Sequence, residues 1–486
     1  MRNSASIVSS FAWKLAERML AQGIGVVIQI VIARMVKPEA IGEMAILLSV
    51  VNVFSVVAQS GFSSYIIQKK DLQADTLSTV TTFSMMISFI CIFFFIIFGD
   101  ILMRVVKYPH LGVYLKVLGW ILLFNAINGI CTAILAREMK FKEMFLRTLV
   151  VLPISLLICF VLIGYGLDLE ALITYNIVNP AITSVFLLIL LKKNGYRFKF
   201  KLKYSRLREA LPYSMRVLLQ DIGNVMCNSL RSFSLGMFYS SNVLAYYDRA
   251  YTYTGYVEES ITYATSGVLL PAMAKEQDNK TKFKYYIENS IALYSMVIVP
   301  ALVGFAAIAP TFTKLILGEK WLPCVPYMYI FSVGFLHYPI LTIQKPAFLA
   351  CGRSDITLKI TIIQNCIALF VLLLTINVSS LCVAVGTSLS LLSYIPLYVV
   401  ATKKHLKISI KDQVGSMIKY ILISLIMVPW VSLLNRIAIN DILKMVLQIF
   451  GGIGIYVFFL IATRDRMFYQ TKAAFFMRVR GGRIHE

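Results

Sequence analysis

Four polar side chains recur within one long apolar segment, residues 211–238. They are Asp221, Asn224, Asn228 and Arg231, at spacings of three, four and three residues, with Arg216 beside them. Because an α-helix turns by about 100° per residue, the four side chains share one stripe of a helix. A charge that faces lipid is costly, so such residues usually face a bundle interior or a wet cavity. The stripe therefore predicts a polar space inside a membrane protein.

Two other apolar segments carry similar polar stripes. In segment 12–33 the stripe holds Arg18, Gln22 and Gln29, and in segment 243–270 polar residues again recur every three or four positions. The candidate substrate-binding residues are Arg18, Gln22, Gln29, Arg216, Asn224, Asn228, Arg231 and Arg249. Four acidic residues on or beside the same stripes are candidates for binding a driving ion, namely Glu17, Asp221, Asp248 and Glu259.

A structural explanation of these charges stays open beside the functional one. Glu17 and Arg18 lie near the end of their segment, where long side chains can extend to the lipid headgroups. Arg231 can form an ion pair with Asp221 or with the following helix. Structural ion pairing is thus an alternative to substrate binding.

The composition places the whole chain in the membrane. Of its 486 residues 58% are hydrophobic, and the mean hydropathy is +0.76. Such values exclude an ordinary soluble domain. Lys14, Glu17 and Arg18 interrupt the first apolar run, so we expect no cleavable signal peptide. We predict fourteen spans: 12–33, 40–60, 80–98, 114–136, 148–163, 171–191, 211–238, 243–270, 288–310, 327–344, 360–376, 381–401, 415–434 and 445–462.

Positive charge alternates between the connections of these segments. The termini and every second connection hold 32 Lys and Arg residues, whereas the other connections hold 8. The positive-inside rule then predicts a multi-pass protein with both termini in the cytoplasm. This distribution accounts for most of the net charge of +23, so we expect contact with membrane lipids and no nucleic-acid partner.

Several common chemical motifs are missing from the sequence. The eight cysteines form no CxxC pair, the four histidines form no metal-ligand cluster, and no Walker A pattern occurs. We therefore expect no cofactor, no metal site and no catalytic residue. A proton or sodium gradient is the candidate driving force.

A weak internal repeat divides the chain. Ile41-Gly42 aligns with Leu244-Ala245, and Ser60-Gly61 aligns with Ser266-Gly267. The repeat predicts an all-α membrane protein with two six-helix lobes of the same orientation and two added helices. The expected parts are an N-lobe (1–205), a C-lobe (206–414) and the extra helices with a basic tail (415–486). In secondary transporters with such repeats, the substrate site lies between the lobes.

The sequence resembles the Wzx-type oligosaccharide flippases, the polysaccharide-biosynthesis branch of the MOP superfamily. It is most similar to the colanic-acid and teichuronic-acid exporters. The resemblance rests on four features in a fixed order, which together span both lobes: Trp13 with Glu17-Arg18, the turn from Ala33 to Gly42, Gly61-Phe62, and Leu317 to Trp321.

The resemblance implies a V-shaped central cavity, and our hypothesis for the mechanism is alternating access. It implies a substrate as well: an oligosaccharide on undecaprenyl pyrophosphate, moved across the bacterial cytoplasmic (inner) membrane for lipopolysaccharide or exopolysaccharide synthesis. A polysaccharide polymerase and glycosyltransferases are then candidate partners. The alternatives are a MATE-like multidrug exporter, which arginine-rich stripes fit poorly, and a membrane polysaccharide polymerase or ligase. An enzyme of the latter kind usually carries a large outer loop with catalytic residues, and no such loop is present.

Overall fold

The computed structural model describes residues 2–59, 61–69, 72–196, 200–275, 280–437 and 439–481. These residues form helices and no strand. The helices group into two compact units, Met1–Ala245 and Tyr246–Glu486, each of which is described by itself below. The fold is thus all-α, as predicted.

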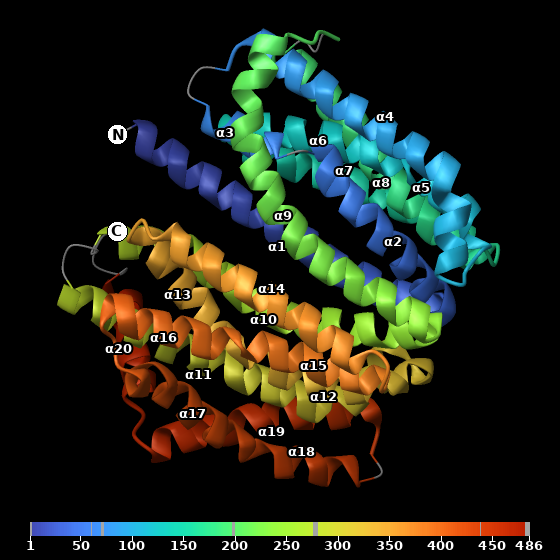
Figure 1. The fold of residues 1–486 in the computed structure, drawn as a ribbon. Coiled ribbons are helices and arrows are strands. Elements are labelled where there is room, and N and C mark those ends of the chain that lie inside the picture. Colours follow the sequence, from blue (N-terminus) through green and yellow to red (C-terminus); the bar gives the residue numbers. More distant parts are fainter. Residues whose placement is uncertain are drawn as a thin grey trace. The chain divides into compact units, whose positions relative to one another are not determined.

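Nine helices belong to the described part of the first unit (Figure 1). They are α1 (Arg2–Met35), α2 (Pro38–Gln59), α3 (Phe62–Gln68), α4 (Ala74–Val105), α5 (Leu111–Leu118), α6 (Trp120–Arg137), α7 (Phe141–Gly164), α8 (Asp168–Lys193) and α9 (Tyr204–Phe238). The helix α10 (Ser241–Lys275) begins at the end of this unit and continues into the second.

The remaining helices of the described chain form the second unit. They are α11 (Lys280–Phe312), α12 (Val325–Gly334), α13 (Tyr338–Ala350), α14 (Ser354–Thr375), α15 (Ser380–Leu392), α16 (Tyr394–Leu406), α17 (Ile410–Leu425), α18 (Met427–Asn435), α19 (Asp441–Ala462) and α20 (Arg466–Gly481). Short π and 3₁₀ turns occupy Thr313–Leu317, Glu319–Cys324 and Phe335–His337.

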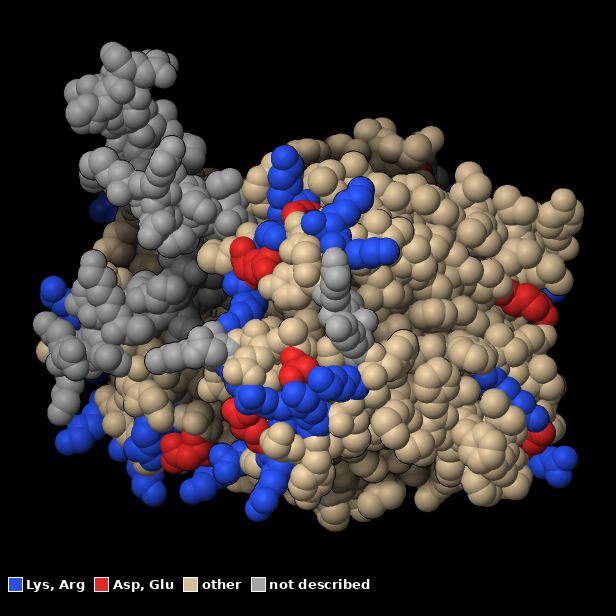
Figure 2. Space-filling model, turned by 90° about the horizontal axis from the view of Figure 1, so that it is seen from above, with Lys and Arg blue, Asp and Glu red and all other residues tan. Residues whose placement is uncertain are grey.

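Eleven helical stretches of the described chain are long and apolar enough to cross a membrane. Each overlaps one predicted span, so the protein is a multi-pass membrane protein. In Figure 2, most of the visible Lys, Arg, Asp and Glu side chains lie in one part of the face shown, and uncharged residues form much of the rest of that face. The other three predicted spans correspond to α1, α9 and α10, which are not among these eleven stretches of the described residues; in α1 the stretch Met19–Met35 is apolar but shorter. The total of fourteen spans therefore remains a prediction.

Within the first unit, α9 packs antiparallel along α2 and α3. At one end, a Cβ atom added to Gly42 would lie 1.8 Å from the backbone oxygen of Ser241, just after α9. At the other end, a Cβ atom added to Gly61 would lie 2.4 Å from the backbone oxygen of Ser214. Gly61 also has a φ of +67°, which only glycine adopts easily. Glycine is therefore required at both ends of this contact.

Polar contacts extend the α2–α9 contact beyond α3. The Lys69 ammonium lies 2.8 Å from Glu209 Oε1 and donates a hydrogen bond to the Tyr65 hydroxyl at 2.9 Å. The Lys69 hydrogen bond holds the pKa of Glu209 below its usual value. Although partial burial of Lys69 opposes its charge, the bonds to Glu209 and Tyr65 raise its pKa. These contacts tie the start of α9 to the loop after α3.

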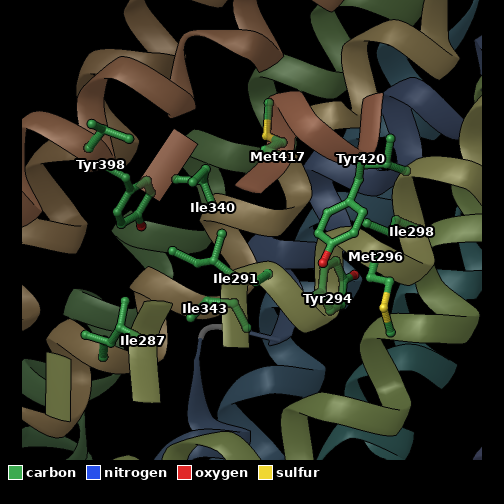
Figure 3. Close-up of a cluster of buried hydrophobic side chains, with 14 of the residues drawn as sticks. Ile287, Ile291, Tyr294, Met296, Ile298, Ile340, Ile343, Tyr398, Met417 and Tyr420 are labelled. Carbon is green, nitrogen blue, oxygen red and sulfur yellow. The ribbon is translucent and has the colours of Figure 1, made fainter. Parts of the chain in front are cut away.

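The second unit is built around α11. Buried side chains of α11, including Ile287, Ile291 and Tyr294, pack with residues of α13 and α17 in one cluster (Figure 3). The Tyr456 hydroxyl of α19 donates a 2.8 Å hydrogen bond to the backbone oxygen of Met296. The predicted extra helices are thus integrated into the core of this unit.

The contact grouping differs from the predicted division of the chain in two places. It places α9 with the first unit, although residues 206–414 are the predicted C-lobe. It also keeps α17, α18 and α19 with the second unit, although residues 415–486 are predicted to be a separate part. The predicted division concerns the sequence repeat, whereas the grouping concerns contacts, so the division remains a prediction.

Candidate functional site

The three predicted polar stripes lie on α1, α9 and α10. These helices have 34, 35 and 35 residues, which at about 1.5 Å per residue is more than the roughly 30 Å of a hydrocarbon core. Each of the three helices is therefore long enough to cross a membrane.

On α1, the acidic candidate Glu17 is engaged in a structural contact. It is 7% exposed, and its Oε1 atom lies 3.4 Å from the Arg147 guanidinium of α7. Trp13 packs on Phe145 of α7 with ring centroids 5.3 Å apart. Sequence reasoning missed Arg147, which it counted as a loop charge. Its position six residues after the start of α7 was the only available signal.

The other α1 candidates lie along the middle of the helix. Gln22 and Gln29 are both half-buried. Gln22 Nε2 is buried and has no hydrogen-bond partner within the described chain. Gln29 interacts with other described residues. The side chain of Arg18 lies outside the described residues.

On α9, most of the predicted polar residues are accessible within the first unit. Arg216, Asp221 and Asn228 are exposed, and Arg231 is half-buried and interacts with other described residues. The side chain of Asn224 lies outside the described residues. The stripe thus presents carboxylate, amide and guanidinium groups on the accessible surface of one helix.

On α10, in the second unit, the predicted residues divide into two groups. Asp248 and Arg249 are half-buried and both interact with other described residues, whereas Glu259 is exposed. Neighbouring Glu258, which sequence reasoning missed, is only 3% exposed. Its carboxylate accepts a hydrogen bond from Thr262, whose hydroxyl also contacts Tyr294 of α11. The missed signal was the helical spacing of Glu258 from the buried residues Tyr247 and Thr254.

The second unit also has an apolar groove. Its volume is about 540 Å³, and it lies between α11, α18 and α19, with Val257 of α10 at its edge. Gly304 of α11 and Gly452 of α19 are among its lining residues, and neither has a side chain that could fill the groove. Of its two polar lining residues, Tyr456 donates its hydroxyl to the backbone of α11, and Gln448 donates to Asn435 at 2.7 Å. The groove is therefore suited to hydrocarbon.

The candidates thus form local groups, each within one unit. The structure brings Glu17 to Arg147, places Asp221 and Asn228 on the exposed surface of α9, and sets Glu258 in a hydroxyl network. Of the predicted ion-binding residues, Glu17 and Asp248 interact with other described residues, and Arg147 is the partner of Glu17. The arrangement offers polar groups on three long helices and a hydrocarbon-sized groove in one chain.

Comparisons with known proteins agree with this description. A profile of the family described as "Polysaccharide biosynthesis protein" matches residues 31–326. The "Lipopolysaccharide biosynthesis protein WzxC" of Escherichia coli (strain K12) is 22% identical over 91% of this chain and 88% of its own length. The "Succinoglycan biosynthesis transport protein ExoT" of Rhizobium meliloti (strain 1021) is 17% identical over 68% of this chain and 67% of its own length.

Solved structures give the same fold. "Lipid II flippase MurJ, inward closed conformation" has a TM-score of 0.73 and 16% identity, and covers 94% of this chain and 99% of its own. An inward-facing "multidrug resistance MATE family transporter of the MOP superfamily" has a TM-score of 0.59 and 17% identity, over 87% and 95%. The fold is that of MOP-superfamily membrane transporters, and the family match covers more than half of the sequence. This chain belongs to the polysaccharide biosynthesis protein family.

Proposed function

We propose that this protein is a flippase that moves a lipid-linked oligosaccharide from the cytoplasmic to the outer leaflet of the cytoplasmic membrane. It acts as a transporter and not as an enzyme. The family match and the relatives named for lipopolysaccharide biosynthesis and succinoglycan transport support this function. The flippase and transporter folds of the structural neighbours support it further.

One observation carries the proposal. The chain combines three long helices that carry polar stripes, α1, α9 and α10, with an apolar groove of about 540 Å³ in the second unit. A sugar pyrophosphate on a polyprenyl chain has the matching pair of properties, a polar head and a hydrocarbon tail. In this proposal the head passes along the polar helices while the tail stays in lipid or in the groove.

The chemistry of the polar residues gives each a role in this proposal. Guanidinium groups bind phosphate oxygens with two parallel hydrogen bonds, so Arg18, Arg216, Arg231 and Arg249 would bind the pyrophosphate. The amides of Gln22, Gln29, Asn224 and Asn228 would bind sugar hydroxyls. Asp221, Asp248 and Glu259 are the proposed sites for a driving proton or sodium ion. Glu17 is the weakest of the ion-binding candidates, because it contacts Arg147.

The proposed orientation follows from the distribution of charge. With 32 Lys and Arg residues on one side and 8 on the other, both termini are placed in the cytoplasm. The glycosyltransferases that build the oligosaccharide would then act on the side from which it is loaded. A polysaccharide polymerase would act on the opposite side.

The test is to identify lipid-linked intermediates in a strain that lacks this protein. Lipid extracts analysed by mass spectrometry are expected to contain accumulated undecaprenyl-pyrophosphate oligosaccharide, and surface polysaccharide is expected to be lost. The gene supplied on a plasmid should reverse both effects. Normal intermediates together with a changed sensitivity to cationic drugs would contradict the proposal and favour a multidrug exporter.

A further inference from the structure

A polar hollow lies in the second unit, apart from the polar stripes and the apolar groove. Its volume is about 450 Å³, and it is formed where α11, α17 and the start of α20 meet. It is lined by Glu288, Asn289, Ala292, Lys411, Asp412, Gly415, Ser416, Lys419, Tyr420, Asp465, Arg466 and Met467. The connections at 402–414 and 463–486 place it at the predicted cytoplasmic side.

The acidic residues of the hollow are all engaged with lysines. Asp465 is 2% exposed and forms an ion pair with Lys419, and its Oδ1 atom accepts a 2.8 Å hydrogen bond from the Phe468 backbone NH. Lys284, at the edge of the hollow, lies 3.5 Å from Glu288 and 3.6 Å from Asp412. Lys284 is shared by Glu288 and Asp412, so the two lysines balance two of the three carboxylate charges.

Two cations of the hollow remain without an acidic partner. The exposed side chains of Lys411 and Arg466 form no ion pair within the described residues. Both lie in the first turn of a helix, since α17 begins at Ile410 and α20 begins at Arg466. The side chains of Ser409 and Asp465 already accept hydrogen bonds from backbone NH groups at these two helix starts. With Lys284 and Lys419 also counted, four cations stand against three carboxylates, and this net positive charge suits one anionic group.

The surface next to the hollow is apolar and continues into the membrane. One face of α17 holds Lys411 and Gly415 of the hollow and continues with three aliphatic residues. These are Ile418, Leu422 and Leu425, which are 50%, 61% and 50% exposed, respectively. Exposure of these aliphatic side chains to water would be unfavourable, whereas exposure to the hydrocarbon of a membrane would be favourable. On α11, the apolar groove begins at Met296, one helical turn after Ala292 of the hollow. A ligand of the hollow can thus extend hydrocarbon along either helix.

We propose that this hollow binds the phosphate headgroup of a membrane phospholipid. Basic pockets between membrane helices on the cytoplasmic side are suited to such headgroups. Lys411 and Arg466 contact the phosphate, Ser416 and Asn289 face the rest of the headgroup, and the acyl chains lie along the exposed face of α17. The site does not depend on the transport cycle, so it is separate from the proposed flippase function.

The experiment is native mass spectrometry of the purified, delipidated full-length protein in detergent. The probe is dioleoyl phosphatidylglycerol. The control lipid is dioleoylglycerol, which lacks the phosphate, and inorganic phosphate is added as a competitor. We expect phosphatidylglycerol to bind and dioleoylglycerol not to bind. Lys411→Ala/Arg466→Ala should weaken phosphatidylglycerol binding about thirtyfold, from roughly 1 kcal/mol per charge. The matched control is Lys403→Ala/Lys404→Ala, two lysines of α16 outside the hollow, which should bind normally.

A second variant tests the hollow without removing charge. A Cβ atom added to Gly415 would meet no atom within 4 Å, so Gly415→Leu extends into the hollow without a clash. We expect it to reduce binding at unchanged thermal stability. Its control is Gly454→Leu on α19. A Cβ atom added to Gly454 also meets no atom within 4 Å, and Gly454 lines neither the hollow nor the groove.

Three outcomes would overturn the inference. If the double variant and Gly415→Leu bind phosphatidylglycerol as tightly as the unaltered protein does, the hollow is excluded as the binding site. Equal binding of dioleoylglycerol would show that the phosphate is not recognised. Displacement of the lipid by inorganic phosphate at equal concentration would identify free phosphate as the ligand.

Discussion

The polar residues of α9 in the first unit differ from two buried acidic residues of the second unit. In the first unit, Arg216, Asp221 and Asn228 of α9 are accessible on the surface of a long helix. In the second unit, Glu258 and Asp465 are buried, and each has hydrogen-bond partners. Polar groups on an accessible helix can bind a substrate that comes and goes. Polar groups that are buried and satisfied hold helices together.

A buried amide network illustrates the second case. Gln344 of α13 donates a 2.7 Å hydrogen bond to Gln413 of α17 and accepts one of 2.7 Å from Thr402 of α16. Gln413 in turn donates to the backbone oxygen of Ile408 at 3.0 Å. Three helices are thereby joined by groups that are fully paired. We therefore expect substitutions of accessible polar residues to affect transport, and substitutions of buried, paired polar residues to affect stability.

The largest expected effect comes from the α2–α9 contact. Gly42→Ala places a methyl group where the backbone of Ser241 lies, so α2 and α9 must separate. We expect a loss of roughly 3 kcal/mol or more in the free energy of unfolding. Thermal unfolding in detergent measures it. Gly23→Ala on α1 is the control, because a Cβ atom there meets nothing within 4 Å. Equal melting of the two variants would contradict the close contact.

A loss of transport is expected from the arginines of the polar stripes. Arg231→Ala removes a half-buried guanidinium from α9, and Arg18→Ala removes the corresponding charge from the stripe predicted for α1. Surface polysaccharide should fall by about tenfold or more at normal protein level, since a lost charge-assisted contact of roughly 1.5–3 kcal/mol has that effect. Arg208→Ala, an exposed arginine near the start of α9, should leave export normal. Unimpaired export by both stripe variants would refute their role in binding phosphate.

A pair of adjacent residues tests the buried polar groups of the second unit. Glu258→Ala removes the acceptor of Thr262 and leaves a small cavity, whereas Glu259 is exposed. We expect Glu258→Ala to lower the free energy of unfolding by about 1–3 kcal/mol, and Glu259→Ala to change it by less than about 0.5 kcal/mol. Thermal melts of both variants are the measurement. An equal effect would mean that burial does not separate these two carboxylates.

The smallest expected effect concerns Glu209, whose pKa is lowered by Lys69. A carboxylate with a lowered pKa stabilises the fold above its ordinary value of 4.5, and this contribution is lost as the pH falls through the folded-state value. Because Glu209 is half-exposed, the contribution is below about 1 kcal/mol. Glu209→Gln should melt slightly earlier than the unaltered protein at pH 7, with the difference shrinking towards pH 4. A difference that grows at low pH would contradict the assignment.

Sequence reasoning identified the long helices and the family, because hydropathy and the order of motifs are local signals. It also singled out α1, α9 and α10 as polar. It did not foresee the contact between Glu17 and Arg147, because pairing across 130 residues has no local pattern. The hydrogen-bond network around the buried Glu258 includes Tyr294 of α11, and this contact between helices has no local pattern in the sequence either. The hollow near Lys411 was missed because its walls come from three separate segments.

The antiparallel contact of α2 and α9 has a consequence for biosynthesis. About 180 residues separate the end of α2 from the end of α9. At roughly 5–20 residues per second, a ribosome needs on the order of 10–35 s to make them. During that interval α2 is already in the bilayer without its partner, and the surfaces around Gly42 and Gly61 are covered only by lipid or by other helices. Assembly of the first unit is therefore completed late, when about half of the chain has been made.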